Sequence, residues 1–236
     1  MESVLFVLVV VVLAVLFIGF AIHAARQHRL RQEALQGLAN SLGLSFDPGR
    51  DYDHDDRYAH LEIFRRGSRR YAYNTVSGRM SLDRHECGVV FGDFHYAVHR
   101  GGPKNKRKKS ERFSYLIVEL PWAGVPDLLI RAEGLFDRLG AMVGFEDIDF
   151  ESEEFSRAFF VKSPDRKFAY DLIDRGMMDF LLAARPPLID MEQGRLCLCS
   201  SRGTWEPDQF SRQLAWIESF LSRWPDHLVA RLSEVA

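Results

Sequence analysis

The nineteen residues from Val4 to Ile22 carry no charge, and most of them are Val, Leu, Ile or Phe. As a helix rising about 1.5 Å per residue, this run covers roughly 28 Å, close to the hydrocarbon thickness of a bilayer. In lipid the backbone amides must be satisfied within the segment, which favours a helix. The sequence therefore predicts a transmembrane anchor over residues 1–25, in contact with the lipid bilayer through residues 4–22.

A cleavable signal peptide is the main alternative for this run. Such a peptide has a basic start, a shorter apolar core and a small-x-small cleavage site after that core. Here the only charged side chain before the run is Glu2, and the triplet Gly19–Ala21 lies inside the run. These features favour a retained anchor.

The charges beside the run predict its direction across the membrane. Arg26, Arg29 and Arg31 follow it, whereas no basic side chain precedes it. Basic residues stay preferentially on the cytoplasmic side. We therefore expect a single-pass protein of the cell membrane, with its N-terminus outside and its C-terminal region in the cytoplasm.

A second helix is expected directly after the anchor, over residues 26–44. Its apolar residues recur at helical spacing, and Gly43 is a natural stop signal. These apolar residues are Leu30, Ala34, Leu35, Leu38 and Leu42.

The remaining composition is that of a globular protein. The 236-residue chain has 27% charged residues, which leaves enough sequence for one large domain or two small ones. A net charge of −2 makes nucleic acid an unlikely partner.

The three cysteines, Cys87, Cys197 and Cys199, are too few for a disulfide framework and suit a reducing compartment. Cys197 and Cys199 alternate along an expected strand, so we expect two core thiols on one face.

Residues 45–125 are expected to be rich in β-structure. The first part, 45–60, is polar and indicates an irregular stretch, whereas strand-like alternation begins at Leu61 and Gly78 marks a turn. Two further strands are expected over Gly88–His99 and Phe113–Leu120, because these runs are rich in β-branched and aromatic residues. The intervening Arg100–Arg112 predicts the tip of an antiparallel hairpin.

Residues 126–236 mix short strands with helices, which predicts an α+β fold rather than a βαβ series. Cap residues, prolines and periodicity give the expected elements. The first expected elements are a strand at Leu128–Arg131, a helix at Gly134–Val143, a helix start at Ser152 and a strand at Phe159–Val161. A helix that begins at Ser163–Asp165 and breaks near Gly176 follows them. The last elements are a hairpin of Leu188–Met191 and Arg195–Cys199 around Gln193–Gly194, and a helix from Pro207 to Pro225.

The hairpin tip is the most basic segment of the chain. Five bases lie within Pro103–Lys109: Lys104, Lys106, Arg107, Lys108 and Lys109. Such a run is often a mobile, solvated loop. It is also suited to an anionic lipid surface, since each base near a membrane contributes about 1 kcal/mol. We take these five residues as a possible contact with anionic lipid or an acidic protein partner.

Acidic side chains gather in residues 146–154, at Glu146, Asp147, Asp149, Glu151, Glu153 and Glu154. Paired carboxylates can hold a metal ion or act as acid and base. Phe145, Ile148 and Phe150 alternate with them, which favours a half-exposed structural segment. A weaker pattern, Asp51, Asp53, Asp55 and Glu62, has calcium-loop spacing, but Asp56 stands where such a loop needs glycine. That pattern favours a solvated acidic loop containing His54.

Searches for catalytic and cofactor motifs return nothing: G-x-S-x-G, the P-loop, G-x-G-x-x-G, H-E-x-x-H and C-x-x-C are all missing from the sequence. We therefore expect no catalytic residues, no metal site and no cofactor, and the sequence leaves a small-molecule ligand unknown.

Several short motifs resemble a family of uncharacterised bacterial single-pass membrane proteins of unknown function. The motifs are Leu42–Phe46, Phe94–Tyr96, Phe145–Ser156 and Phe159–Ile173, followed by a helix with Phe180 and Leu181. The resemblance implies a bacterial membrane protein with an N-terminal helix, and it brings no assigned site residues.

These observations favour a membrane-tethered cytoplasmic binding or scaffold module without enzymatic activity. The alternative is an enzyme with an unrecognised active site, built from the 146–154 carboxylates. The sequence does not identify the partner, the pathway or the oligomeric state.

Overall fold

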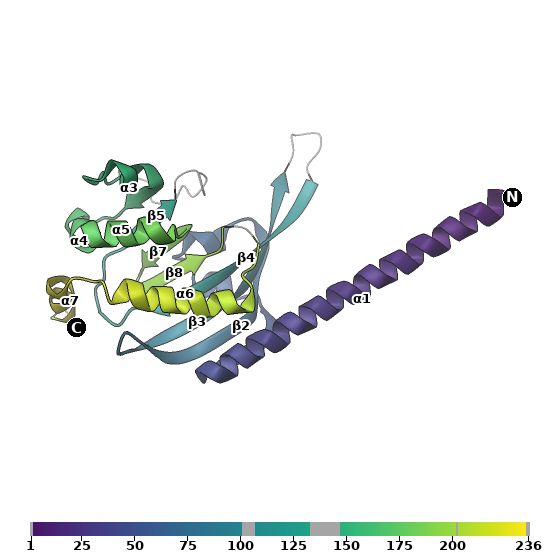
Figure 1. Ribbon diagram of the computed structural model, residues 1–236, viewed down its shortest axis with the longest axis horizontal. Helices are drawn as coiled ribbons and strands as arrows, with labels where there is room; N and C mark the ends of the chain where they lie inside the picture. Colours follow the sequence, from purple (N-terminus) through teal and green to yellow (C-terminus); the bar gives the residue numbers. More distant parts are fainter. Residues whose placement is uncertain (1, 101–106, 133–146, 202, 235–236) are drawn as a thin grey trace.

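Seven α-helices and one eight-stranded antiparallel sheet make up the described part of the chain (Figure 1). The computed structural model describes residues 2–100, 107–132, 147–201 and 203–234. The strand order is β1-β2-β3-β4-β8-β7-β5-β6, so strands from both halves of the chain share one sheet. The predicted α+β class is confirmed.

The longest element is α1, Glu2–Leu42, an unbroken helix of 41 residues. It joins the predicted anchor and the predicted second helix into one rod. Gly43 ends it as expected, with φ 69° and with the Leu44 amide donating to the Ala39 carbonyl at 2.9 Å. Its N-terminal half projects from the domain, with Phe17 73% exposed (Figure 1). Within the described residues α1 is the one helix long and apolar enough to cross a membrane.

A four-stranded meander forms one half of the sheet. Its strands are β1 (Ser45–Asp51), β2 (Ser68–Leu82), β3 (His85–Arg100) and β4 (Arg107–Glu119). The hairpin of β3 and β4 is confirmed, and its strands run further than the sequence indicated.

The expectation of an irregular stretch over residues 45–60 is wrong at its start, because β1 is a strand. Pro48 and Gly49 are typical of loops, but β1 lies at the sheet edge and its register shifts between Asp47 and Arg50. An edge strand with a bulge tolerates proline, because no neighbour requires its missing N–H.

Two further expectations in this half are also corrected. The alternation does not begin at Leu61, since η1 (Glu62–Arg65) is a 3-10 helix and β2 starts at Ser68. Gly78 is not a turn but lies inside β2. A β-carbon there would come within 2.8 Å of a Leu44 methyl carbon, so the glycine lets the chain leaving α1 pack onto β2.

The described residues of the second half form four short strands and five helices. Its elements are β5 (Leu128–Ala132), α3 (Glu153–Ala158), β6 (Phe159–Lys162), α4 (Arg166–Leu172), α5 (Arg175–Ala184), β7 (Leu188–Glu192), β8 (Arg195–Cys199), α6 (Pro207–Leu221) and α7 (Asp226–Ser233). The hairpin around Gln193 and Gly194 is confirmed, with φ 51° and 72° at its turn. The Ser152 cap of α3 is confirmed as well.

The helix ends in this half need three comments. Asp165, rather than Ser163, caps α4, because the Ser163 hydroxyl donates to the Asp127 carbonyl at 2.7 Å. An additional helix, α7, follows Pro225, which the sequence analysis took as the end of the last helix. The helix expected at residues 134–143 lies outside the described residues.

The sheet buries a core on each face. One face packs against the C-terminal half of α1 and against helices of the second half, with α5 and α6 lying across it (Figure 1). The other face is covered by α2 (His54–Arg57) and η1, which place Leu61 and Phe64 on the sheet. Cys197 and Cys199 lie in this second core as free thiols, as expected.

His54 lies in the second core rather than in a solvated loop. It is 1% exposed, and its ring lies 4.7 Å from that of Tyr115 and 4.8 Å from that of Phe64, centroid to centroid. The expected solvated acidic loop is therefore wrong at this residue. Burial, and then the Arg57 charge, lower the pKa of His54 to about 3. The imidazole is neutral at physiological pH.

This burial predicts a pH dependence. The folded-state pKa of His54 is below its unfolded value near 6.5, so the unfolded chain binds more protons below pH 6.5. Stability should therefore fall with acidification, by about 1.4 kcal/mol per pH unit from this residue. We expect His54→Phe to remove that contribution when unfolding of the full chain in detergent is measured between pH 7 and pH 5.

His227→Phe, at an exposed position on α7, is the matched control. An unchanged pH slope in the His54 variant would contradict the buried, neutral imidazole.

Candidate functional site

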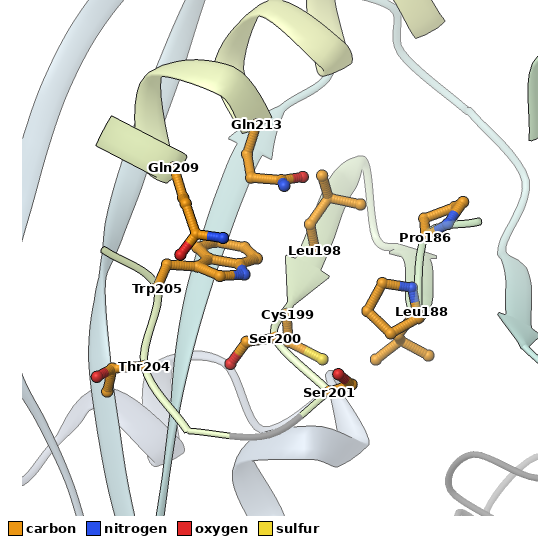
Figure 2. Close-up of a pocket in the computed structure, with 11 residues that line it drawn as sticks. Pro186, Leu188, Leu198, Cys199, Ser200, Ser201, Thr204, Trp205, Gln209 and Gln213 are labelled. Carbon is orange, nitrogen blue, oxygen red and sulfur yellow. The ribbon is translucent and has the colours of Figure 1, made fainter. Parts of the chain in front are cut away.

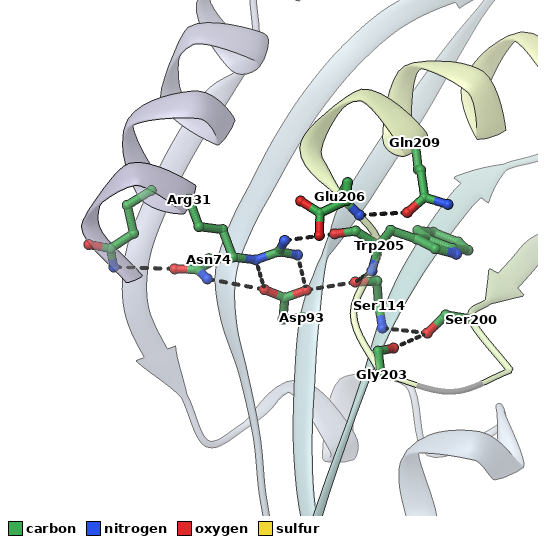
Figure 3. A network of polar contacts seen from close by, with 10 residues as sticks. Arg31, Asn74, Asp93, Ser114, Ser200, Gly203, Trp205, Glu206 and Gln209 are labelled. Atoms are coloured by element: carbon green, nitrogen blue, oxygen red, sulfur yellow. Dashed lines mark hydrogen bonds and ion pairs between the residues drawn. The ribbon is translucent and has the colours of Figure 1, made fainter. Parts of the chain in front are cut away.

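The most connected polar group in the structure is the carboxylate of Asp93, at the middle of β3 (Figure 3). Asp93 is fully buried, and it accepts two hydrogen bonds from Arg31 of α1, from Nε at 2.9 Å and from Nη2 at 2.7 Å. Asn74 Nδ2 donates at 3.1 Å and Ser114 Oγ at 2.7 Å. An ionised carboxylate without such partners would be very costly to bury.

Arg31 ties three parts of the chain together. Its third bond, from Nη1, reaches the Trp205 carbonyl at 2.7 Å, in the segment that leads into α6. Gln32 on the same helix donates to Asn74 Oδ1 at 3.2 Å. The sequence analysis took Arg31 only as a charge flanking the membrane. In the structure its side chain is 17% exposed and docks α1 on the sheet.

A bulge in β2 positions the Asn74 amide for this network. The β2–β3 register shifts between Tyr73 and Val76, and Asn74 takes φ 52°. Gly92 lies opposite, where a β-carbon would be 2.8 Å from the Asn74 carbonyl oxygen. The close approach of these backbones therefore requires glycine at position 92.

Ser114 extends the network toward α6. Its hydroxyl accepts from the Trp205 amide at 2.8 Å while it donates to Asp93, and its own amide donates to Ser200 Oγ at 2.9 Å. The α6 start is closed by Glu206 and Gln209 in a capping box.

A cavity of about 240 Å³ adjoins this end of the network (Figure 2). Trp205, Gln209 and Gln213 line one side, and Ser200 and Cys199 line the other. Burial raises the pKa of the Cys199 thiol to about 12, so it stays protonated and is a poor nucleophile. The described residues that line the cavity include no His, Asp or Glu that could act as a base. The cavity therefore gives no support to nucleophilic catalysis.

A larger groove of about 530 Å³ lies at the open end of the meander, and we call it the basic groove. It is lined by Arg50, Tyr52, Arg69, Tyr71, His95, Ala97, Lys108 and Ser110. Tyr71 is central, since Arg50 Cζ lies 4.9 Å from its ring centroid and the His95 ring stacks on it at 4.6 Å. The Arg69 carbonyl lies 3.1 Å from His95 Nδ1 and fixes that ring. Bases beside an aromatic floor are suited to an anionic group.

The structure brings one of the five predicted basic residues into this groove. Lys108 lines it, whereas Lys109, the next residue on β4, bonds Glu111 at 2.8 Å. Arg107 is the first residue of β4, paired in register with Arg100. Lys104 and Lys106 lie outside the described residues. Arg50 and Arg69 were missed. Arg50 has no basic neighbours in the sequence, and Arg69 belongs to a basic run, Arg65–Arg70, that the sequence analysis did not single out. Both meet Lys108 only through strand pairing.

The acids of residues 146–154 do not gather at one site within the described residues. Asp147 Oδ1 accepts from the Val161 amide at 3.0 Å, and Glu153 pairs with Arg157 at 2.6 Å across one helix turn. Ile148 and Phe150 are buried between them, as expected for a structural segment. Glu146 lies outside the described residues.

Two of the four acids with calcium-loop spacing form ion pairs with arginines. Asp51 pairs with Arg57, and Asp55 with Arg70 at 2.5 Å. Among the described residues no three His, Cys, Asp or Glu side chains lie close enough together to hold a metal ion.

Comparisons with known proteins show a likeness of fold. No family model matches the chain, and no curated protein matches it. A solved structure, that of the mycobacterial trehalose monomycolate transport factor A, TtfA, is similar with a TM-score of 0.56 over 82% of this chain and 96% of the other. The sequence identity is 14%, so the likeness extends to the fold alone. The resemblance to uncharacterised bacterial membrane proteins stays a prediction.

The Arg31–Asp93 pair predicts a large loss of stability when one partner is removed. Arg31→Ala leaves the buried Asp93 carboxylate without its cation, which should cost about 3–5 kcal/mol in unfolding of the full chain in detergent. Adding Asp93→Asn should recover part of the loss by removing the lone charge.

Arg29→Ala is the matched control on the same helix. Arg29 is 79% exposed and pairs with Glu33 at 3.0 Å, so its loss should change stability by no more than about 0.5 kcal/mol. Equal effects of the two arginine variants would contradict the docking role of Arg31.

Proposed function

We propose that this chain is a single-pass membrane protein whose C-terminal region lies in the cytoplasm and binds a partner at the bilayer surface, without enzymatic activity. The anchor is the N-terminal half of α1, and the basic groove contacts anionic lipid headgroups. The domain thereby presents its other surfaces to a protein partner at a set distance from the membrane.

One observation carries this proposal: the same helix is fully exposed and apolar at one end and docked at the other. Phe17, Ile18 and Phe20 are between 56% and 73% exposed, whereas Leu35 and Ala39 are fully buried against the sheet. An exposed apolar rod of this kind is stable when lipid covers it. The docked half supplies a rigid connection between bilayer and domain.

The position of the basic groove supports the lipid contact. In Figure 1 the end of the hairpin at which β3 finishes and β4 begins lies on the side of the domain from which α1 projects. From Arg31 back to Ile22, α1 rises about 14 Å. From Asp93, which Arg31 contacts, β3 runs six residues to His99, opposite Lys108, or about 20 Å. Both stretches run toward the side of the domain from which α1 projects, which supports a contact between Lys108 and the bilayer surface.

The similar solved structure is named as a transport factor. That name describes TtfA. It is compatible with a non-enzymatic, membrane-associated role for this chain, and it adds no substrate or partner here.

The orientation is tested with reporters fused after Ala236. A reporter that folds only in the cytoplasm should be active, and alkaline phosphatase, which needs the periplasm, should be inactive. Arg26→Glu with Arg29→Glu should scramble this pattern, because the basic flank directs it. Arg31 is left unchanged, since its loss would also destabilise the domain. An active phosphatase fusion of the parent chain would overturn the orientation.

The lipid contact is tested with the full chain in nanodiscs. A polarity-sensitive dye on Ser110→Cys should report a less polar surrounding in phosphatidylglycerol discs than in phosphatidylcholine discs. Arg69→Gln with Lys108→Gln should lower the ratio of the bound to the unbound state about thirtyfold, at about 1 kcal/mol per base. High salt should do the same.

The control for this experiment is Arg157→Gln with Arg212→Gln, two exposed helical arginines with the same total charge change. If the control lowers the signal as much as the groove variant, net charge rather than the groove is responsible. No difference between the two lipids in the parent chain would exclude the lipid contact.

A further inference from the structure

A second cleft lies on the opposite face of the sheet, where residues 56–65 cross beside the β7–β8 hairpin. It has a volume of about 520 Å³, within the usual range of small-molecule sites. Four acids line it, Asp56 and Glu62 from the crossing segment and Asp190 and Glu192 from β7. We call it the acidic cleft. It has no part in the basic groove or in the Asp93 network.

Asp190 is the unusual member of this cleft. Leu188, Asp190 and Glu192 alternate along β7, so Asp190 faces the cleft from the position of a core residue. It is 5% exposed, and its carboxyl takes part in none of the hydrogen bonds or ion pairs found among the described residues. Burial, and then Glu192, Glu62 and Asp127, raise its pKa to about 8. A buried acid normally has a partner, and the charges that act most strongly on this one are those of other acids.

Two neighbours of Asp190 in the cleft, Glu192 and His60, also form no side-chain hydrogen bond or ion pair among the described residues. Burial and the Asp127 charge raise the pKa of Glu192 to about 7, although Arg65 at the same cleft opposes the shift. His60 also lines the cleft, and within the described residues its buried Nε2 has no hydrogen-bond partner. Burial lowers the pKa of His60, so its ring is neutral and one ring nitrogen can accept a hydrogen bond.

We propose that the acidic cleft binds a primary ammonium or guanidinium group. Once ionised by the bound cation, Asp190 and Glu192 provide negative charge, and His60 provides a neutral acceptor, so a ligand that only donates hydrogen bonds satisfies all three. Arg57 also lines the cleft, but its guanidinium forms an ion pair with Asp51, so it does not serve as the cation for Asp190. A metal ion fits less well, because the described His, Cys, Asp and Glu side chains form no group of three suited to hold one.

Binding of such a cation has a measurable proton signature. At pH 7 Asp190 is mostly protonated, and a bound cation favours the carboxylate. The proton must leave Asp190 for the solvent as the cation binds. Titration calorimetry in two buffers of different ionisation enthalpy measures this release directly.

The test uses the full chain in phosphatidylcholine nanodiscs, whose headgroups donate no N–H, and agmatine as the probe. Agmatine should bind the parent chain with proton release at pH 7. Asp190→Asn should weaken binding by about tenfold or more and reduce the release to the part that comes from Glu192. Asp208→Asn, at an exposed acid on α6, is the matched control and should leave both unchanged.

Two further measurements make the result decisive. Asp190→Asn should fold, and at pH 8.5 its Tm should be no lower than that of the parent, because an ionised Asp190 is unfavourable in the folded state. A blocked Gly-Arg-Gly peptide separates the sources of the cation. If it binds as agmatine does, the ligand can be a basic side chain of a partner; if only agmatine binds, the ligand is a small free cation.

Three results would overturn the proposal. The first is the lack of any agmatine binding at millimolar concentration. The second is binding that Asp190→Asn leaves unchanged, since this would place agmatine elsewhere on the surface. The third is an Asp190-dependent preference for Mg²⁺ or Ca²⁺ over agmatine, which would make the cleft a metal site.

Discussion

The buried carboxylate of Asp93 is the constraint on which the arrangement of this domain depends. A charge without access to water must be matched by donors, and here they come from α1, from the β2 bulge and from β4. The same arginine that neutralises Asp93 also holds the Trp205 carbonyl at the entry to α6. Segments far apart in the chain therefore have to meet at Asp93 before its carboxylate has all of its hydrogen-bond donors. Such a buried pair favours one packing over others more than it adds net stability.

The chain separates two kinds of charge onto two faces of one sheet. The basic groove lies at the open end of the meander, near where α1 leaves the domain, and the acidic cleft lies under α2 and η1. The alternation of side chains along a strand makes this possible: His95 and Asp93 point to the α1 face, while Phe94 between them enters the second core. A lipid contact and a cation site on opposite faces do not compete for surface.

Local sequence signals predicted much of the fold. Ser152, Gly43 and the Gln193–Gly194 turn each have a short-range physical cause, namely a cap or a positive φ, and each was found where expected. The start of β1 was missed, because Pro48 and Gly49 indicate a loop unless the strand is known to be an edge. Such knowledge requires the whole sheet, which no local pattern contains.

The candidate sites were harder to predict for the same reason. Arg31 looked like its neighbours Arg26 and Arg29, and its partner Asp93 lies 62 residues away in the sequence. Lys108 was found through its charge run, whereas the arginines that share its groove arrive from other strands. Asp190 did leave a signal: a charged residue at an inward position between apolar strand residues. That signal could have been read, since a buried acid in a strand requires an explanation.

The unbroken course of α1 has a geometric consequence for any encounter in the plane of a bilayer. Each residue of a helix turns the chain by about 100° and advances it by about 1.5 Å. A continuous α1 therefore fixes both the distance of the domain from the apolar run and the rotation of the domain about the helix axis. In the proposed membrane-anchored arrangement, the rotation of α1 about its own axis therefore also sets the direction that the domain faces. A membrane protein that binds one side of the anchor would then face one defined side of the domain. Inserting a single residue between the apolar run and Arg31 would turn the domain away while leaving its fold intact.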